Sequence, residues 1–335
     1  MHIDQGMALA LAFGRSLISY HADGDPVLVS ASFAVTNRCN LRCSYCNTPF
    51  LDPTDLPLSS IELLFERLFS FGARRLGLAG GEPLVRRDLG DIVAMAKRKR
   101  FYVTLNSNLS LYDSHRGALK DVDLFFTSLD GDRAAHEVAR GKGSYEKVLE
   151  SIREIAAEGR PVVAICVVTR HNLDAIDHLL AEAERGGFRV HFQPQCTGTE
   201  IVRGDIAPDL TTERLQLFFR TVLEHKIRGR PVASSRPYLE ALSAWDDFRR
   251  VALFDPSVRC AASRGFLYVD PQGKAYPCAF TKGKAAPVDL LGSDWSSALG
   301  RETPCTRCAV GPYLEFNLLY QRPLATALSL ARSYR

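Results

Sequence analysis

A close group of cysteines occurs near the start of the chain, at Cys39, Cys43 and Cys46. In the spacing C-x3-C-x2-C, one short loop can bring three thiolates to a single inorganic centre. Three thiolates can hold three irons of a [4Fe–4S] cube and leave the fourth iron open for an outside ligand. The alternative is a zinc site that lacks its fourth ligand. No other cysteine or histidine lies nearby in the sequence to complete such a site.

A second group of cysteines lies toward the end of the chain, at Cys260, Cys278, Cys305 and Cys308. The apolar residues that flank 271–273 predict a β-hairpin, which would bring the first two of these thiols together. Four thiolates are enough to close a second cube completely. A four-cysteine zinc site would fit the same spacing.

Two cysteines stand apart from these groups. Cys166 lies inside an apolar run, which predicts a buried structural thiol. Cys196 follows a later predicted strand and could donate a hydrogen atom to a substrate radical, although a plain loop cysteine is the simpler interpretation.

The elements that must position these residues are short apolar runs alternating with helical patterns. Predicted strands cover 28–35, 76–79, 101–105, 124–126, 161–168 and 188–193, and predicted helices cover 59–71, 88–98, 109–120, 145–158 and 173–185. About six strand–helix units in regular alternation indicate a parallel sheet with helices outside. The predicted fold class is α/β, with a partial (β/α)6 TIM-like barrel followed by a small cysteine-rich domain.

The domain organisation follows from where this alternation begins and ends. The predicted segments are an N-terminal helical extension (1–27), the barrel (28–228), a helical linker (229–259), a cysteine-bearing domain (260–312) and a C-terminal helix (313–335).

Unusual polar motifs come directly after the predicted strands. Gly80-Gly81-Glu82-Pro83 follows the second strand, Asn106 the third, and Ser128-Leu129-Asp130-Gly131 the fourth, with His136 and Arg140 a little further on. In βα barrels the carboxyl ends of the strands meet at the face that carries chemistry. Gly-Gly-x-Pro and a lone Asn are also ordinary turn residues, so the motifs gain weight from their order and position.

Together these motifs resemble the radical S-adenosylmethionine (SAM) superfamily over about residues 30 to 200, including the aromatic Tyr45 before the third cysteine. The resemblance implies that Cys39, Cys43 and Cys46 hold the cluster that cleaves SAM. It also implies SAM contacts: the stretch Gly80, Gly81, Glu82 and Pro83 for the amino group, Asn106 for the ribose, and Ser128 and Arg140 for the carboxylate. The expected product is a 5′-deoxyadenosyl radical, which abstracts a substrate hydrogen.

The C-x12-G-x4-C spacing from Cys260 to Cys278 is similar to the SPASM/twitch auxiliary-cluster subgroup. Since no cysteine follows Cys308, the twitch type with one auxiliary [4Fe–4S] cluster is favoured. A fully ligated cluster suits electron transfer, which implies oxidation of the substrate.

Composition and charge limit the classes of binding partner that the sequence suggests. The net charge of +4 is too small to indicate nucleic acid, and no apolar run is long enough to span a membrane. Clustered cysteines without a signal peptide predict metal ligation in a reducing cytoplasm. The apolar N-terminal run and the apolar, basic C-terminal segment leave open peripheral membrane contact and a lipid-like substrate. A reductase or a flavodoxin- or ferredoxin-type donor is the expected electron source.

Three functions compete at this stage. The first is an oxidoreductase of a small-molecule or lipid pathway. The second is a maturase of ribosomal peptides, which forms crosslinks or dehydrogenates side chains; only about thirty residues precede the first strand, which leaves little room for a fused leader-recognition domain. The third is a non-catalytic zinc-binding module.

Overall fold

The computed structural model describes residues 4–24, 26–197, 199–204, 209–250, 252–253, 260–301, 303 and 307–333. Its main feature is a nine-stranded sheet in the order β10-β9-β8-β1-β2-β3-β4-β5-β6. The barrel strands are β1 (Ser30–Thr36), β2 (Arg75–Gly80), β3 (Tyr102–Asn106), β4 (Leu124–Ser128), β5 (Val162–Val168) and β6 (Arg189–Pro194), all parallel to their neighbours. The predicted six-stranded parallel arrangement is therefore confirmed.

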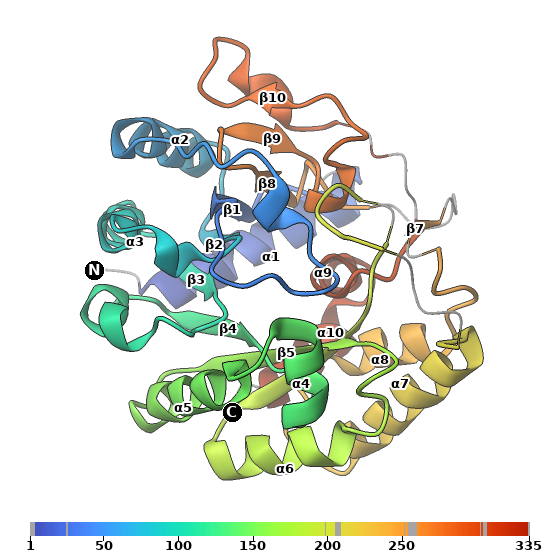
Figure 1. The fold of residues 1–335 in the computed structure, drawn as a ribbon. Helices are drawn as coiled ribbons and strands as arrows, with labels where there is room; N and C mark the ends of the chain where they lie inside the picture. Colours follow the sequence, from blue (N-terminus) through green and yellow to red (C-terminus); the bar gives the residue numbers. More distant parts are fainter. Residues whose placement is uncertain are drawn as a thin grey trace.

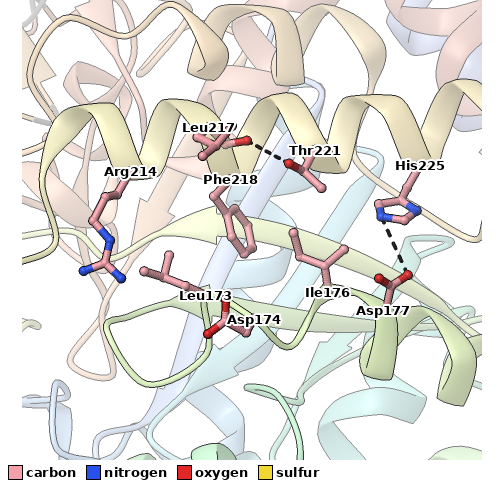
Figure 2. Close-up of a pocket in the computed structure, with 9 residues that line it drawn as sticks. All are labelled: Leu173, Asp174, Ile176, Asp177, Arg214, Leu217, Phe218, Thr221 and His225. Atoms are coloured by element: carbon pink, nitrogen blue, oxygen red, sulfur yellow. Dashed lines mark hydrogen bonds and ion pairs between the residues drawn. The ribbon is translucent and has the colours of Figure 1, made fainter.

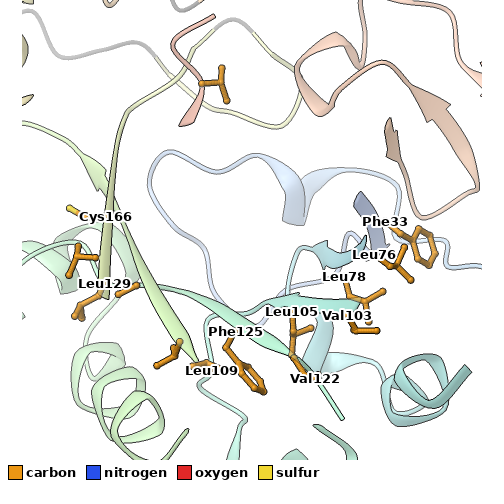
Figure 3. Close-up of a cluster of buried hydrophobic side chains, with 14 of the residues drawn as sticks. Phe33, Leu76, Leu78, Val103, Leu105, Leu109, Val122, Phe125, Leu129 and Cys166 are labelled. Atoms are coloured by element: carbon orange, nitrogen blue, oxygen red, sulfur yellow. The ribbon is translucent and has the colours of Figure 1, made fainter. Parts of the chain in front are cut away.

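Helices cover the outer face of this sheet (Figure 1). They are α2 (Leu58–Ser70), α3 (Leu89–Arg98), α5 (Ser144–Ala157), α6 (Ile176–Gly186) and α7 (Thr212–Ile227), with the shorter α4 (Arg133–Arg140) at the end of β4. The predicted helix at 109–120 is instead a short 3-10 helix, η3 (Asp113–Leu119). Strand residues that face the helices form the core, as Figure 3 shows for Phe33, Leu78 and Phe125.

The C-terminal part joins the barrel directly instead of standing apart from it. The predicted hairpin is present as β8 (Phe266–Val269) and β9 (Lys274–Tyr276), followed by β10 (Val288–Asp289). Strand β8 pairs in parallel with β1, with Phe33 opposite Val269. The hairpin thus extends the barrel sheet, and Asp270 at the end of β8 lies at the same sheet edge as the loop after β1.

Helices from both ends of the chain lie within the curve of the sheet (Figure 1). These are α1 (Gln5–Asp23), α9 (Gly311–Gln321) and α10 (Pro323–Ser333); α8 (Arg236–Ser243) packs beside α7 and α10. Contacts between Ser16 Oγ and Tyr320 Oη (2.9 Å) and between the rings of Phe13 and Phe316 (5.4 Å) join α1 to α9. Among the described helices, none has the length and apolar character needed to cross a bilayer.

The remaining elements are short. They are the 3-10 helices η1 (Thr48–Phe50), η2 (Pro83–Val85), η4 (Ala279–Thr281) and η5 (Trp295–Ala298), and a two-stranded ribbon of β7 (Ala252–Leu253) and β11 (Arg307–Cys308).

Candidate active site

The first cysteine group lines a cavity at the carboxyl ends of the barrel strands. The cavity has a volume of about 150 Å³, and its lining residues are Cys39, Leu41, Cys43, Tyr45, Cys46, Pro49, Gly80, Gly81, Asn106, Ser107, Asn108, Ser128 and Arg140. The main-chain N–H of Leu41 donates to the sulfur of Cys39 at 3.4 Å. Burial raises the pKa of the Cys39 thiol to about 11. All three thiols of the motif thus face one cavity together with residues from the ends of β2, β3 and β4.

Gly80, the last residue of β2, and the following Gly81 lie against the backbone that leads into the cysteine loop. A Cβ atom on Gly80 would lie 2.2 Å from the carbonyl oxygen of Thr36, and one on Gly81 would lie 2.3 Å from that of Arg38. The N–H of Gly81 donates to Thr36 O (2.8 Å), and the N–H of Glu82 donates to Arg38 O (2.9 Å). Only residues without a side chain allow this close approach. The glycines therefore hold the loop and also form part of the cavity wall.

The carboxylate of Glu82 is fully buried and is occupied by donors from the protein. It accepts hydrogen bonds from Ser107 Oγ (2.7 Å), the N–H of Asn108 (2.6 Å) and the N–H of Leu84 (3.0 Å). Burial raises the pKa of this carboxyl despite these donors. The sequence suggested an acceptor for a cationic ligand, whereas in the structure Glu82 ties the end of β2 to the loop after β3. Pro83 begins η2, and neither residue lines the cavity.

Among the described residues that line the cavity, Arg140 is the one cation. Its Nε donates to Asp130 Oδ2 at 2.5 Å, and its Nη atoms contact the hydroxyl of Tyr45 and, at 3.8 Å, the sulfur of Cys43. Burial is the largest single influence and opposes the charge of Arg140, but Asp130, Tyr45 and Cys43 together outweigh it and raise the pKa of Arg140 above its ordinary value. The carboxylate of Asp130 is almost fully buried and fixes the guanidinium beside the cysteine loop.

Two further residues hold Asp130 and its turn. The ring nitrogen Nδ1 of His136 accepts the N–H of Asp130 at 3.1 Å, and Asn172 Nδ2 donates to the carbonyl of Asp130 at 3.1 Å. Burial and the charge of Arg140 lower the pKa of His136 to about 4, so the ring is neutral near pH 7. A lone histidine near the start of a helix is more often a surface or capping residue, but His136 is buried within the fold. No sequence motif indicated Asn172, because it comes from the loop after β5.

In the second group, the thiol of Cys308 interacts electrostatically with those of Cys278 and Cys260. Burial raises the pKa of the Cys308 thiol well above its ordinary value, and the neighbouring thiols of Cys278, Cys260 and Cys196 add to this rise. The main-chain N–H of Val310 donates to the sulfur of Cys308 at 3.3 Å. Cys305 lies outside the described residues.

The two cysteines that stand apart in the sequence are both buried. Cys166 is inaccessible to solvent and packs in the core (Figure 3), as predicted. Cys196 is 8% exposed, donates to Pro194 O at 3.6 Å, and has its pKa raised to about 12 by burial. It is not among the residues that line the described cavity, and its thiol interacts electrostatically with that of Cys308.

A buried ion pair occurs at the end of β8, one strand away from the cysteine loop. Asp270 stabilises the turn after β8, where its Oδ1 accepts the N–H groups of Gln272 (3.1 Å) and Lys274 (3.0 Å). Its Oδ2 lies 3.5 Å from Nζ of Lys282, and both side chains are at least nine-tenths buried. The sequence did not indicate Lys282, since only the fold brings it to Asp270.

A larger cavity, of about 470 Å³, lies away from all of these cysteines. It opens between α6 and α7 in the outer helix layer, with Phe218 at its base and His225 and Asp177 at one end (Figure 2). His225 Nε2 is 3.8 Å from Asp177 Oδ1, and Arg230 also pairs with Asp177. None of the motif residues reaches this cavity.

Comparison with known proteins gives one family and several relatives. Residues 33–183 match the radical SAM superfamily. The chain is 28% identical over 241 residues to Fe-coproporphyrin III synthase of Methanosarcina barkeri (strain Fusaro / DSM 804), a match that covers 66% of this chain and 59% of that protein. The match thus spans less than two thirds of the relative's length.

Solved structures share the fold at low sequence identity. SuiB of Streptococcus suis bound to S-adenosylmethionine superposes with a TM-score of 0.68 at 13% identity, covering 88% of this chain and 70% of that one. SuiB bound to its precursor peptide SuiA gives a TM-score of 0.64 at 13% identity, covering 86% and 70%. These likenesses confirm the partial barrel architecture.

Proposed function

We propose that the chain is an enzyme of the radical SAM superfamily, whose model matches residues 33–183, and that it oxidises a small-molecule or lipid-pathway substrate with the help of a second, auxiliary cluster. Enzymes of this superfamily use a [4Fe–4S] cluster and S-adenosylmethionine. The observation that carries the proposal is the single cavity that unites the thiols of Cys39, Cys43 and Cys46 with the ends of three barrel strands.

The cavity residues fit these cofactors. The described lining residues include three thiols and no further cysteine or histidine, which suits a cube with one open iron, and the N–H of Leu41 already points to the sulfur of Cys39. When bound, the cluster and SAM supply a 5′-deoxyadenosyl radical that abstracts hydrogen from the substrate. The chain's own residues bind and orient these groups and keep water away from the reacting atoms.

We assign the SAM contacts to Gly80, Gly81, Asn106, Ser128 and Arg140, all of which line the cavity. A guanidinium carries five N–H donors, and the contacts to Asp130, Tyr45 and Cys43 use three of them. Donors therefore remain on Arg140 for the carboxylate of SAM. We assign Glu82 and Pro83 an indirect role, in which they fix the position of the glycines and of the loop after β3 and do not contact SAM.

The auxiliary cluster is assigned to Cys260, Cys278, Cys305 and Cys308. Its support is the electrostatic interaction of the Cys308 thiol with those of Cys278 and Cys260, and the N–H of Val310 directed at the sulfur of Cys308. A cluster with four cysteine ligands has no open iron and suits electron transfer, which favours oxidation of the substrate. Cys196 lies near this group, and its assigned role remains that of a buried loop cysteine.

Peptide maturation is the second candidate. It is favoured by the shared architecture with SuiB, which has been solved with its precursor peptide. The sequence relative is named for the formation of an iron porphyrin, which favours a small-molecule substrate instead. The two candidates differ in substrate, and the chemistry at the cysteine cavity is the same in both.

Cluster content after anaerobic reconstitution tests the proposal. The wild type should hold about eight irons and eight sulfides per chain, as expected for two four-iron clusters. Replacing Cys39, Cys43 and Cys46 with alanine should halve both numbers and abolish SAM cleavage. Replacing Cys260, Cys278 and Cys308 should halve them too, while dithionite-driven SAM cleavage persists.

Two outcomes would contradict the proposal. Zinc in place of iron and sulfide would leave only a zinc-binding module. Equal loss of SAM cleavage in both triple variants, with the fold intact, would refute the division between the two clusters. For the substrate, candidates labelled with deuterium can be compared, because the label should appear in 5′-deoxyadenosine only with the true substrate.

A further inference from the structure

An exposed aromatic ring stands beside the cysteine loop. Phe50 ends the short helix η1, four residues after Cys46, and its side chain is 56% exposed. The guanidinium of Arg203 lies 4.5 Å from the centre of this ring, and that of Arg42 lies 5.6 Å from it. Cation–π contacts at these distances hold the ring between two positive charges. We refer to Phe50, Arg42 and Arg203 as the Phe50 patch.

The two arginines carry net positive charge to the surface. Both are exposed. Arg42 Nη1 donates to the main-chain oxygens of Cys39 (2.7 Å) and Leu41 (3.0 Å), which are uncharged acceptors. Within the described ranges no carboxylate forms an ion pair with either arginine of the patch. Arg38 on the same segment differs, because Asp55 pairs with it at 2.5 Å.

The patch is fastened to the backbone of the cysteine loop itself. Arg42 lies between Cys39 and Cys43 in the sequence, and the N–H of Arg203 donates to the carbonyl of Tyr45 at 2.9 Å. Four residues span at most about 14 Å, which bounds the distance from the Cα of Phe50 to that of Cys46. The Phe50 patch therefore lies next to the loop that holds the thiols, and two of its residues belong to the same short segment.

The ring does not serve the cavity. Its neighbour Pro49 lines the cavity, whereas Phe50 is not among the lining residues and faces solvent. Arginine and aromatic side chains are enriched at the centres of protein–protein interfaces, and a ring already held in place loses little entropy on binding. An exposed ring between two cations that have no ion-pair partner among the described residues therefore suits a partner whose face is acidic around an apolar centre.

We propose that the Phe50 patch is the docking surface for an acidic one-electron donor protein of the flavodoxin or ferredoxin type. The donor gives up one electron, and the centre held by Cys39, Cys43 and Cys46 gains it; no bond or proton changes hands at the patch. Opposite charges would steer the two proteins together, and salt would weaken the steering. This inference rests on the proposed assignment of these three cysteines.

The test measures binding and reduction separately. An acidic flavodoxin, oxidised for calorimetry and kept reduced by its NADPH-dependent reductase for kinetics, serves as the probe. Arg203→Glu should raise its Kd and its KM in SAM cleavage about tenfold at low salt, and the difference should shrink at high salt. Phe50→Ala, which keeps both charges, should also weaken binding. Arg220→Glu on α7 is the matched control, since Arg220 is exposed and α7 lies in the outer helix layer (Figure 1).

Dithionite, a small donor that needs no docking surface, separates this inference from the proposed function. SAM cleavage with dithionite should be the same in Arg203→Glu, Phe50→Ala and the wild type. Equal loss with dithionite and flavodoxin would place Arg203 within the SAM site and overturn the docking surface. Equal Kd and KM values for Arg203→Glu and Arg220→Glu would also overturn it. Failure of the wild type to cleave SAM with dithionite would instead refute the proposed function.

Discussion

Replacing Gly81 with alanine should disable the cysteine loop without touching a cysteine. The new methyl group would lie 2.3 Å from the carbonyl oxygen of Arg38 and 2.6 Å from that of Asn37, where 3.4 Å is the lower limit of ordinary contact. Both neighbours are backbone atoms, so no side chain can rotate away. The segment that leads into Cys39 must shift by about 1 Å.

A shift of this size acts directly on catalysis. The loop is fixed to Gly81 and Glu82 by two main-chain hydrogen bonds, so the cysteines would move with it. A misplacement of about 1 Å near reacting groups can cost about a hundredfold in rate. We therefore expect Gly81→Ala to lower the rate of dithionite-driven SAM cleavage about a hundredfold and to lower iron content in the first cluster.

Gly14→Ala is the matched control. A methyl group at Gly14, within α1, meets no atom within 4 Å, and alanine should stabilise that helix by up to about 1 kcal/mol. The assay measures iron and sulfide per chain and then SAM cleavage under anaerobic conditions. If Gly81→Ala retained the iron content and rate of Gly14→Ala, the close approach would have no functional role, and the reasoning would be refuted.

Two further variants probe buried charges. Asp130→Asn leaves the buried guanidinium of Arg140 without its counter-charge and should lower the free energy of unfolding by about 3–5 kcal/mol, measured with denaturant. Adding Arg140→Gln should recover part of this loss. If the losses of the two single variants simply added in the double variant, the two side chains would not be coupled. Burial raises the pKa of the Glu315 carboxyl from 4.5 to about 7, so the folded protein binds this proton more tightly than the unfolded chain does. The stability that the bound proton contributes is therefore full below pH 4.5 and is lost as the pH rises to about 7. The stability of Glu315→Gln relative to the wild type should therefore rise by about 3 kcal/mol across that window, and a constant difference would contradict the shift.

Local patterns predicted the barrel well because each strand and helix carries its own periodicity. The apolar run that became β5 and the alternation of six strands with helices needed no knowledge of distant residues. Local patterns could not predict the pairing of β8 with β1, because the two strands lie more than two hundred residues apart in the sequence. The segment at 113–119 also escaped prediction, since apolar spacing does not separate an α-helix from a 3-10 helix.

The site was predictable where short motifs carry it. Gly80, Asn106 and Arg140 follow strands in order, and the structure brings them to one cavity. Their roles toward SAM stay predictions. The role of Glu82 depends on Ser107 from another loop, and that of Asp270 depends on Lys282, so neither follows from spacing along the chain.

The ladder between β8 and β1 has a consequence for how this protein can be divided. A variant truncated before residue 260 would lack β8, and β1 would become an edge strand of the sheet. Its main-chain donors and acceptors on that side would be unpaired, in the strand that leads into the cysteine loop. Exposed edges of this kind recruit other strands and promote aggregation. The barrel is therefore not a module that can be separated from the cysteine-rich segment. A truncated variant is expected to be unsuitable for studying the first cluster alone.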